Sequence, residues 1–164
     1  FLFCCYAGMR YSDFTNLSKK NIVDINQETW LIYKSVKTGT EVRLPLYLLF
    51  AGKGIVILNK YRNNLEDFFR LRDNSNINKD LIIIAKLAGL SKKISFHTAR
   101  HTNATLLIYN GVNITTVQKL LGHKSVKTTQ VYTNIMDMTI VHDLEKMKQA
   151  ALGIKKKTDN SFNK

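Results

Sequence analysis

One stretch of this chain, residues 29–44, has the pattern of β-strands, whereas apolar residues elsewhere recur mainly with the spacing of helices. Residues 29–36 are rich in β-branched and aromatic side chains. Residues 41–44 alternate polar with apolar positions and are followed by Pro45, the single proline. Thr38-Gly39 between the two segments is typical of a turn. We therefore expect a mainly α-helical (α+β) fold with a small antiparallel β-hairpin or three-stranded sheet.

Glycine, asparagine and serine mark the boundaries of the predicted helices. Helices are expected at residues 1–7, 12–17, 47–72 (one or two, interrupted at Gly52 and Gly54), 79–88, 96–109, 114–121, 125–135 and 137–152. Ser12 or Asp13 is expected to cap the second helix, and Asn78 the helix at 79–88.

The length of 164 residues and the apolar content of 45% suit one domain with a core of its own. We expect this domain at residues 1–152, beginning inside a helix whose start is missing, and a basic, disordered tail at 153–164. Cys4 and Cys5 are adjacent in an apolar run and are predicted to be buried thiols in a reducing compartment. No segment reaches a transmembrane length, so we expect an intracellular, cytoplasmic protein.

Lysine and arginine outnumber aspartate and glutamate by 25 to 12, which gives a net charge of +13. An excess of this size favours a polyanionic partner, with nucleic acid as the first candidate. A basic protein without such a partner is the alternative that charge alone leaves open.

Five residues supply groups suited to attack on a phosphate diester: Arg10, His97, Arg100, His123 and Tyr132. Arginine can bind two phosphate oxygens at once, and the tyrosine phenol can form a covalent phosphoester. His97 and Arg100 are three residues apart on a predicted helix and therefore share a face. Each residue also has a purely structural interpretation: a solvent-facing pair, a histidine at a helix end and a half-buried tyrosine.

A zinc site is an alternative interpretation of the segment around His97. His97 and His101 have the i, i+4 spacing of a zinc helix. Thr98 stands where a metalloprotease needs its glutamate, and no further Cys or His pair completes a ligand set. We therefore expect no metal.

Taken together, these segments resemble the catalytic domain of the tyrosine recombinases, also called the phage integrase family. The family's boxes match residues 8–13 (GMRYSD), 37–46 (KTGTEVRLPL), 97–100 (HTAR) and 121–123 (LGH), and the nucleophile box ends in Tyr132. The match runs from the first box to the final helix, and the hairpin phrase is most similar to integrases of bacterial mobile elements.

The resemblance implies a site-specific recombinase or integrase that cleaves and rejoins DNA through a 3′-phosphotyrosyl intermediate. Arg10 and Arg100 are then expected to bind the non-bridging phosphate oxygens, and Tyr132 to attack the phosphorus. Asp13 is expected either to hold the Arg10 guanidinium or to form only an exposed ion pair.

The remaining roles follow from the same resemblance. His97 is expected to act as a base or an orienting group, and His123 to donate to a phosphate oxygen, although the sequence does not decide which histidine does which. Lys37 on the hairpin is the expected general acid, with Lys34 as a nearby rival. No cofactor is required.

The resemblance also implies partners. Family members bind double-stranded DNA and self-associate on it, as a tetramer in the synaptic complex. Their separate core-binding domain has no counterpart in this sequence. Their C-terminal helix docks on a neighbouring protomer, and the equivalent apolar face here comprises Met138, Val141, Leu144 and Met147. Packing of this helix on its own domain is the alternative.

Three other functions are alternatives to a recombinase. A DNA-binding module without catalysis would be expected to lack Tyr132 or an arginine, and neither is lost. A type IB topoisomerase shares this kind of site, but the Leu-Gly-His box and the short hairpin favour a recombinase. An RNA-binding protein is disfavoured because no aromatic-rich sheet face is evident.

Overall fold

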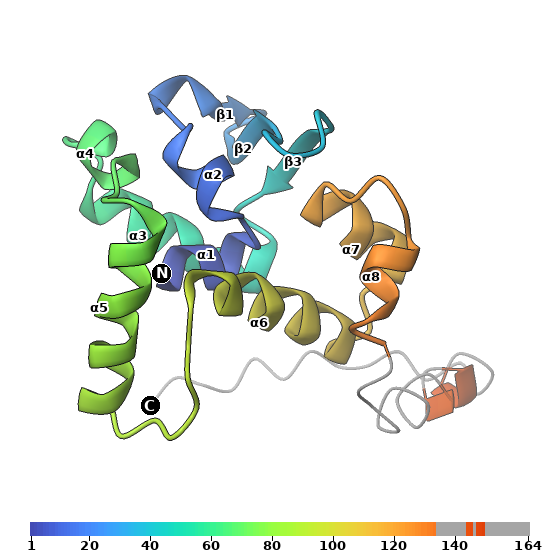
Figure 1. Cartoon of the computed structure of the whole chain (residues 1–164). Helices are drawn as coiled ribbons and strands as arrows, with labels where there is room; N and C mark the ends of the chain where they lie inside the picture. The colour runs from blue at the N-terminus through green and yellow to red at the C-terminus, as the bar shows by residue number, and fades with distance from the viewer. Residues whose placement is uncertain (134–143, 146, 150–164) are drawn as a thin grey trace, which may run out of the picture.

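The computed structural model describes residues 1–133, 144, 145 and 147–149. One small sheet lies at one edge of the molecule, at the top of the view, and the helices lie below and beside it (Figure 1). The elements of residues 1–133 are, in order, α1 (Leu2–Ala7), α2 (Tyr11–Thr15), the 3-10 helix η1 (Lys19–Asn21), β1 (Ile22–Ile25), β2 (Glu28–Lys34), β3 (Glu41–Pro45), the 3-10 helix η2 (Leu49–Gly52), α3 (Lys53–Lys60), α4 (Leu65–Phe69), α5 (Asn74–Leu87), α6 (Phe96–Tyr109), α7 (Ile114–Leu121) and α8 (Lys127–Gln130). The expected α+β class is confirmed.

The sheet is antiparallel, with the strand order β1-β2-β3. Leu31 of β2 lies opposite Leu44 of β3, and neither side chain is exposed to solvent. Tyr33 and Val42, the next inward-facing pair, are also buried. Because alternate residues point to the same side of a strand, the buried row places the sheet's inner face against the helices.

Two helices have the boundaries that the sequence predicts. α6 covers residues 96–109, and Ser95 and Thr98 form a reciprocal capping box at its start. α7 covers residues 114–121, and the side chain of Asn113 accepts a hydrogen bond of 2.9 Å from the Thr115 N–H. Both signals are local, which is why the sequence alone locates these helices.

The expected start of α5 is wrong. The helix begins at Asn74, five residues before the predicted position, because Asp73 accepts the capping hydrogen bond from the Asn76 N–H at 3.1 Å. Asn78, the predicted cap, lies inside the helix. Its side chain accepts a hydrogen bond of 2.7 Å from the Phe96 N–H and so joins α5 to α6.

Other boundaries also differ. α2 ends at Thr15, and neither Ser12 nor Asp13 caps it through a side chain. The segment 47–72, expected as one or two helices, forms η2, α3 and α4. Gly52 lies at the junction of η2 and α3, where an interruption was expected, whereas Gly54 lies inside α3.

At the other end of the domain, α8 is shorter than the predicted helix at residues 125–135 and ends at Gln130. The tail at 153–164 and most of the final helix predicted at 137–152 lie outside the described residues.

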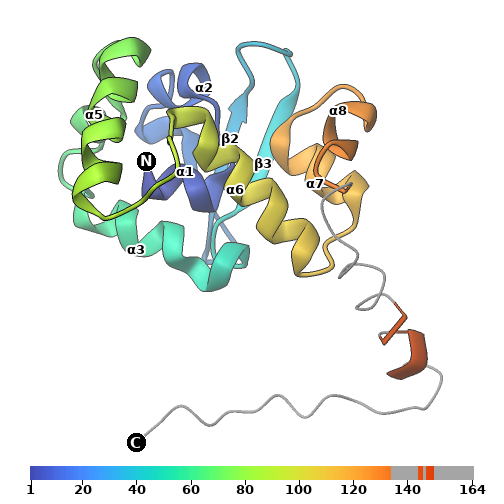
Figure 2. The same ribbon diagram turned by 60° about the horizontal axis from the view of Figure 1, so that its bottom comes forward.

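α6 crosses the middle of the molecule (Figure 2). It packs along α1 and also contacts α5 and α7, while α7 contacts β3. α1 places Phe3, Cys4 and Ala7 in the core. Cys4 and Cys5 are free and buried, as expected, and burial raises the pKa of the Cys4 thiol to about 12.

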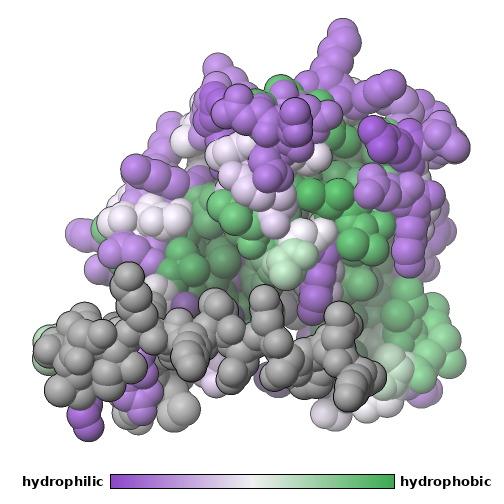
Figure 3. Space-filling model, turned by 180° about the vertical axis from the view of Figure 1, so that it is seen from behind, coloured by the Kyte–Doolittle hydropathy of each residue, from purple (hydrophilic) through white to green (hydrophobic). Residues whose placement is uncertain are grey.

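The surface is mixed in polarity, with apolar patches between polar regions on the face seen from behind (Figure 3). Ile83, Ile84 and Leu87 of α5 are exposed. In the part of the chain that the structure describes, no helix is both long and apolar enough to cross a membrane.

The positive-φ glycines allow a stability prediction. Gly8 and Gly89 have nearly equal φ angles of +66° and +68°. A Cβ on Gly8 would lie 2.6 Å from the Asn103 Oδ1, whereas a Cβ on Gly89 would meet nothing within 4 Å. Gly89→Ala therefore introduces backbone strain alone and is expected to lower the free energy of unfolding by about 1–2 kcal/mol. Gly8→Ala is expected to lower the free energy of unfolding by about 1–3 kcal/mol more, because of overpacking. Urea denaturation measures both, and equal losses would contradict the close packing described.

Candidate active site

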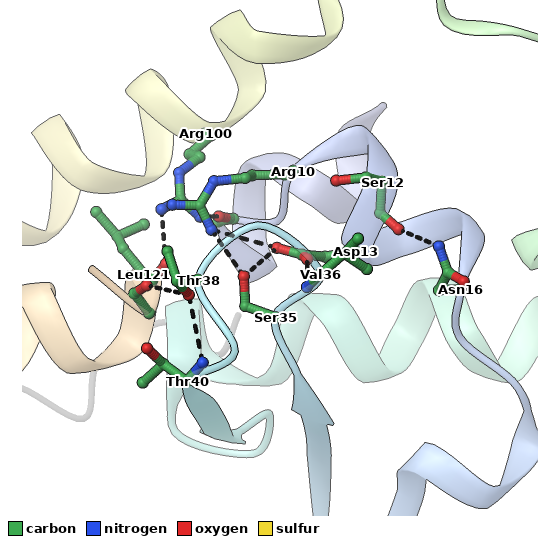
Figure 4. A network of polar contacts seen from close by, with 12 residues as sticks. Arg10, Ser12, Asp13, Asn16, Ser35, Val36, Thr38, Thr40, Arg100 and Leu121 are labelled. Atoms are coloured by element: carbon green, nitrogen blue, oxygen red, sulfur yellow. Dashed lines mark hydrogen bonds and ion pairs between the residues drawn. The ribbon is translucent and has the colours of Figure 1, made fainter. Parts of the chain in front are cut away.

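Arg10 lies between α1 and α2, immediately after the turn at Gly8. Its Nη1 donates to the Ser35 Oγ at 3.1 Å and to the Asp13 Oδ2 at 3.4 Å. The side chain is 14% exposed, so Arg10 is partly open to solvent while these two bonds hold its guanidinium (Figure 4).

Asp13 is buried and joins α2 to the hairpin. Its Oδ1 accepts the Val36 N–H at 2.8 Å, and its Oδ2 accepts the Ser35 hydroxyl at 3.3 Å. The structure thus places Asp13 as a buried anchor of Arg10 and excludes the exposed ion pair weighed from the sequence. Ser35 was not identified from the sequence, although a small polar residue at an inward position after Leu31 and Tyr33 is a usable signal.

Arg100 projects from α6 and is 1% exposed. Its Nη1 donates to the Gly8 carbonyl at 2.7 Å and its Nη2 to the Leu121 carbonyl at 2.6 Å, so this side chain joins α1, α6 and α7. Both acceptors are neutral. Within the described residues, no carboxylate forms an ion pair with Arg100.

The two guanidinium groups lie next to each other (Figure 4). Burial lowers the pKa of Arg100 to about 10, and the positive charge of Arg10 adds to this effect, so Arg100 remains charged at neutral pH. Asp13 is the single carboxylate hydrogen-bonded to the pair in the described part of the chain. Two buried or half-buried cations with one anion form a local positive charge that suits a phosphate group.

The two predicted histidines lie beside this pair. His123 is buried, and its Nδ1 is 2.9 Å from the Thr129 Oγ1. Burial lowers its pKa to about 4, with further lowering by Arg100 and Arg10. The pKa of His97 is also lowered, first by burial and then by the charges of His101 and Arg100.

Tyr132 is 5% exposed and follows α8. Burial raises the pKa of its phenol, whereas Arg100 and Arg10 act in the opposite direction. Its ring makes an edge contact with His101, with ring centroids 5.4 Å apart. The phenol is therefore close enough to both guanidinium groups to interact with their charges.

Lys37 is exposed in the turn between β2 and β3, and its charge contributes to lowering the pKa of His97. Lys34, the rival candidate, lies in β2 opposite Glu41. The structure thus brings Arg10, Lys37, His97, Arg100, His123 and Tyr132 to one region, with Asp13 beneath it.

The histidine pair was also a candidate for zinc binding. The rings of His97 and His101 pack edge to face with centroids 4.4 Å apart. In residues 1–133 and the few described beyond them, no group of three or more His, Cys, Asp or Glu side chains suits a metal ion.

Tyr33 is a feature of the site that the sequence did not reveal. Its hydroxyl is buried and has no hydrogen-bond partner in the described structure. Burial and the neighbouring Asp13 raise its pKa, which keeps the phenol neutral. The charges of Arg100 and Arg10 lower the pKa of this phenol and so act in the opposite direction.

Comparison with known proteins identifies the family of this chain. Residues 1–138 match the phage integrase family, and the chain therefore belongs to it. The resemblance drawn from the sequence boxes is confirmed.

Individual relatives agree. The tyrosine recombinase XerC of Rickettsia prowazekii is 30% identical over 159 residues, which cover 92% of this chain and 49% of XerC. The chain thus spans about half the length of that relative. The crystal structure of XerA recombinase matches with a TM-score of 0.69 at 28% identity, over 88% of this chain and 55% of XerA.

A third match shows the shared fold alone. It is a lambda integrase dimer bound to a COC′ core site, with a TM-score of 0.64 at 23% identity, over 80% of this chain and 49% of that one.

The buried neutral His123 predicts a pH dependence of stability. Its pKa is about 4 in the folded protein, against about 6.5 when unfolded, so its contribution is complete above pH 6.5 and is lost as the pH falls towards 4. Between pH 7 and 5 this amounts to about 2 kcal/mol. His123→Gln is expected to lose less stability over this interval than the wild type, by about that amount. Urea titrations at the two pH values measure the difference, and identical losses would contradict the assignment.

Proposed function

We propose that this chain carries the catalytic centre of a site-specific DNA recombinase, within a catalytic domain at residues 1–152. The observation that carries the proposal is the pair of adjacent guanidinium groups of Arg10 and Arg100 (Figure 4), whose positive charges also act on the phenol of Tyr132. Two adjacent cations and a hydroxyl nucleophile suit a reaction in which a phosphodiester gains negative charge in its transition state.

Arg10 and Arg100 bind the non-bridging oxygens of the scissile phosphate. Arg10 is held by Asp13 and Ser35 with one side open, and Arg100 is fixed by backbone carbonyls. Fixed donors need little reorganisation as charge develops, and such preorganised groups stabilise the transition state most effectively.

Tyr132 is the nucleophile, by resemblance to the family. Its phenolic oxygen attacks the phosphorus, the bond from phosphorus to the 5′ oxygen breaks, and a 3′-phosphotyrosyl link and a 5′-hydroxyl result. His97, whose lowered pKa keeps it neutral, accepts the phenol proton, and the Lys37 ammonium gives a proton to the leaving oxygen. Attack by a second 5′-hydroxyl reverses the step, so no metal or nucleotide is consumed.

His123 donates to a phosphate oxygen through Nε2. The Thr129 hydroxyl lies 2.9 Å from Nδ1 and can donate to it when the proton of the neutral ring is on Nε2. Thr129 thereby accommodates the tautomer that can serve as a phosphate ligand.

The partner is double-stranded DNA, on which copies of the chain assemble, as a tetramer in the synaptic complex. The net charge of +13 supports a polyanionic partner, and the lambda integrase of the same fold is a dimer on its core site. We place the protein in the bacterial cytoplasm, at the nucleoid when bound to DNA, with a mobile element as its source.

Covalent trapping tests the proposal. The full open reading frame that contains these residues is mixed with a nicked duplex carrying the site it selects from a randomised DNA pool. We expect a covalent protein–DNA adduct, because the nick releases the short strand and prevents reversal. Tyr132→Phe should form none, as judged by denaturing gel electrophoresis.

Controls separate the alternatives. Tyr109→Phe replaces an exposed phenol on α6 and should leave adduct formation intact. Adducts that persist in Tyr132→Phe rule out this nucleophile, and tight binding without any adduct indicates a DNA-binding module. Relaxation of a supercoiled plasmid lacking the selected site would favour a topoisomerase.

A further prediction concerns the C-terminal segment. Deleting the residues after Asp137 is expected to reduce assembly on DNA beyond a single protomer, because the apolar face at Met138 and Val141 would be lost. Native gel shifts with one-site and two-site duplexes measure assembly. Unchanged higher-order complexes would show that this segment packs on its own domain instead.

A further inference from the structure

Three consecutive residues, 121–123, hold three separate parts of the site. The Leu121 carbonyl accepts from Arg100, and the Gly122 carbonyl accepts from the Thr38 hydroxyl at 3.0 Å. The His123 Nδ1 meets the Thr129 hydroxyl. The end of α7 thus connects α6, the β2–β3 turn and the segment that leads to the tyrosine.

The contact between the turn and α7 is close. Gly122 has φ +61°, and a Cβ there would lie 2.6 Å from the Val42 Cγ2. β3 and the end of α7 therefore touch directly, and the Gly122 carbonyl stays within reach of Thr38. Figure 4 shows Thr38 near the arginine pair.

Lys37 lies between two anchored neighbours. Val36 donates its N–H to the Asp13 Oδ1 at 2.8 Å, and Thr38 donates its hydroxyl to Gly122. The backbone bonds of Gly39 and Thr40 to Ser35 remain within the hairpin and do not fix it to the helices. The exposed side chain of Lys37 is thus carried on a short segment fixed at both ends.

We propose that Thr38 is a positioning residue for Lys37. Its bond to the Gly122 carbonyl holds the turn against α7, so that the Lys37 ammonium reaches the departing 5′ oxygen. This inference rests on the proposed function, because it requires Lys37 to be the general acid. Without the bond, the turn is fixed at one end only and proton donation becomes slower, while binding of DNA and attack by Tyr132 are unaffected.

A change of leaving group tests the inference. In a substrate with sulfur in place of the bridging 5′ oxygen, the departing thiolate needs no proton, because a thiol has a pKa of about 8.5. Thr38→Val keeps the side-chain volume and removes the hydroxyl, which donates to the Gly122 carbonyl and accepts from the Thr40 N–H at 3.4 Å. It should slow single-turnover adduct formation on ordinary DNA about five- to tenfold, the effect of one hydrogen bond. On the sulfur substrate its rate should be within about twofold of the wild type, because proton donation is bypassed.

Matched variants complete the experiment. Thr38→Ser keeps the donor and should restore the rate on ordinary DNA. Thr40→Val should react as the wild type, because Thr40 contributes its backbone N–H to this network. Lys37→Ala should lose more on ordinary DNA, about 100-fold or beyond, and be rescued by sulfur in the same way.

The outcomes are distinct. An equal loss of rate for Thr38→Val on both substrates, or no loss on either, overturns the positioning role. A wild type that forms no adduct with either substrate overturns the proposed function itself. A Lys37→Ala variant that sulfur does not rescue removes Lys37 as general acid, and the inference fails with it.

Discussion

The buried charge of Arg100 is the constraint on which the rest of the site depends. A guanidinium that is 1% exposed needs hydrogen-bond acceptors within the protein, and here the backbone carbonyls of Gly8 and Leu121 accept from it. These neutral acceptors take two of its five N–H donors and leave its charge uncompensated. Arg10 lies beside it, and the two positive charges repel each other. An anion placed between the two groups would reduce this repulsion and so lower the free energy of the site.

This constraint explains several features of the fold. Gly8 turns the chain with positive φ where a side chain would strike Asn103, and its carbonyl is thereby aimed at Arg100. Asn103 in turn donates to the carbonyls of Cys5 and Tyr6, so the end of α1 is bonded to two successive turns of α6. These bonds hold the segment that carries the Gly8 carbonyl in place, which favours a preorganised phosphate site.

The sequence predicted features that depend on local signals. α6 and α7 have capping residues next to their first turns, and the hairpin has alternation with a Thr-Gly turn, so these elements were located correctly. The start of α5 was misplaced because Asp73 and Asn78 are equally good caps in isolation. Which of them caps the helix depends on Phe96, a residue distant in sequence that bonds to Asn78.

The site, like the fold, was predicted from the sequence only in part. Motif spacing identified the groups suited to the chemistry, and the fold brings them together. The partners that hold them were not identified. Ser35 stands at an inward position just after β2, but its contact with Arg10 and the contact of Thr129 with His123 are set by the tertiary fold. The orphan hydroxyl of Tyr33 also became evident only when its surroundings were known.

Crystals of the protein soaked in tungstate, a heavy analogue of phosphate, test the shared phosphate site most directly. Anomalous scattering locates the tungsten without reference to any assumed position. The account predicts one tungstate within about 3 Å of both guanidinium groups, Arg10 on its open side and Arg100 from beneath. Tungstate bound to one arginine with the other turned away, or bound only elsewhere on the molecule, would contradict it.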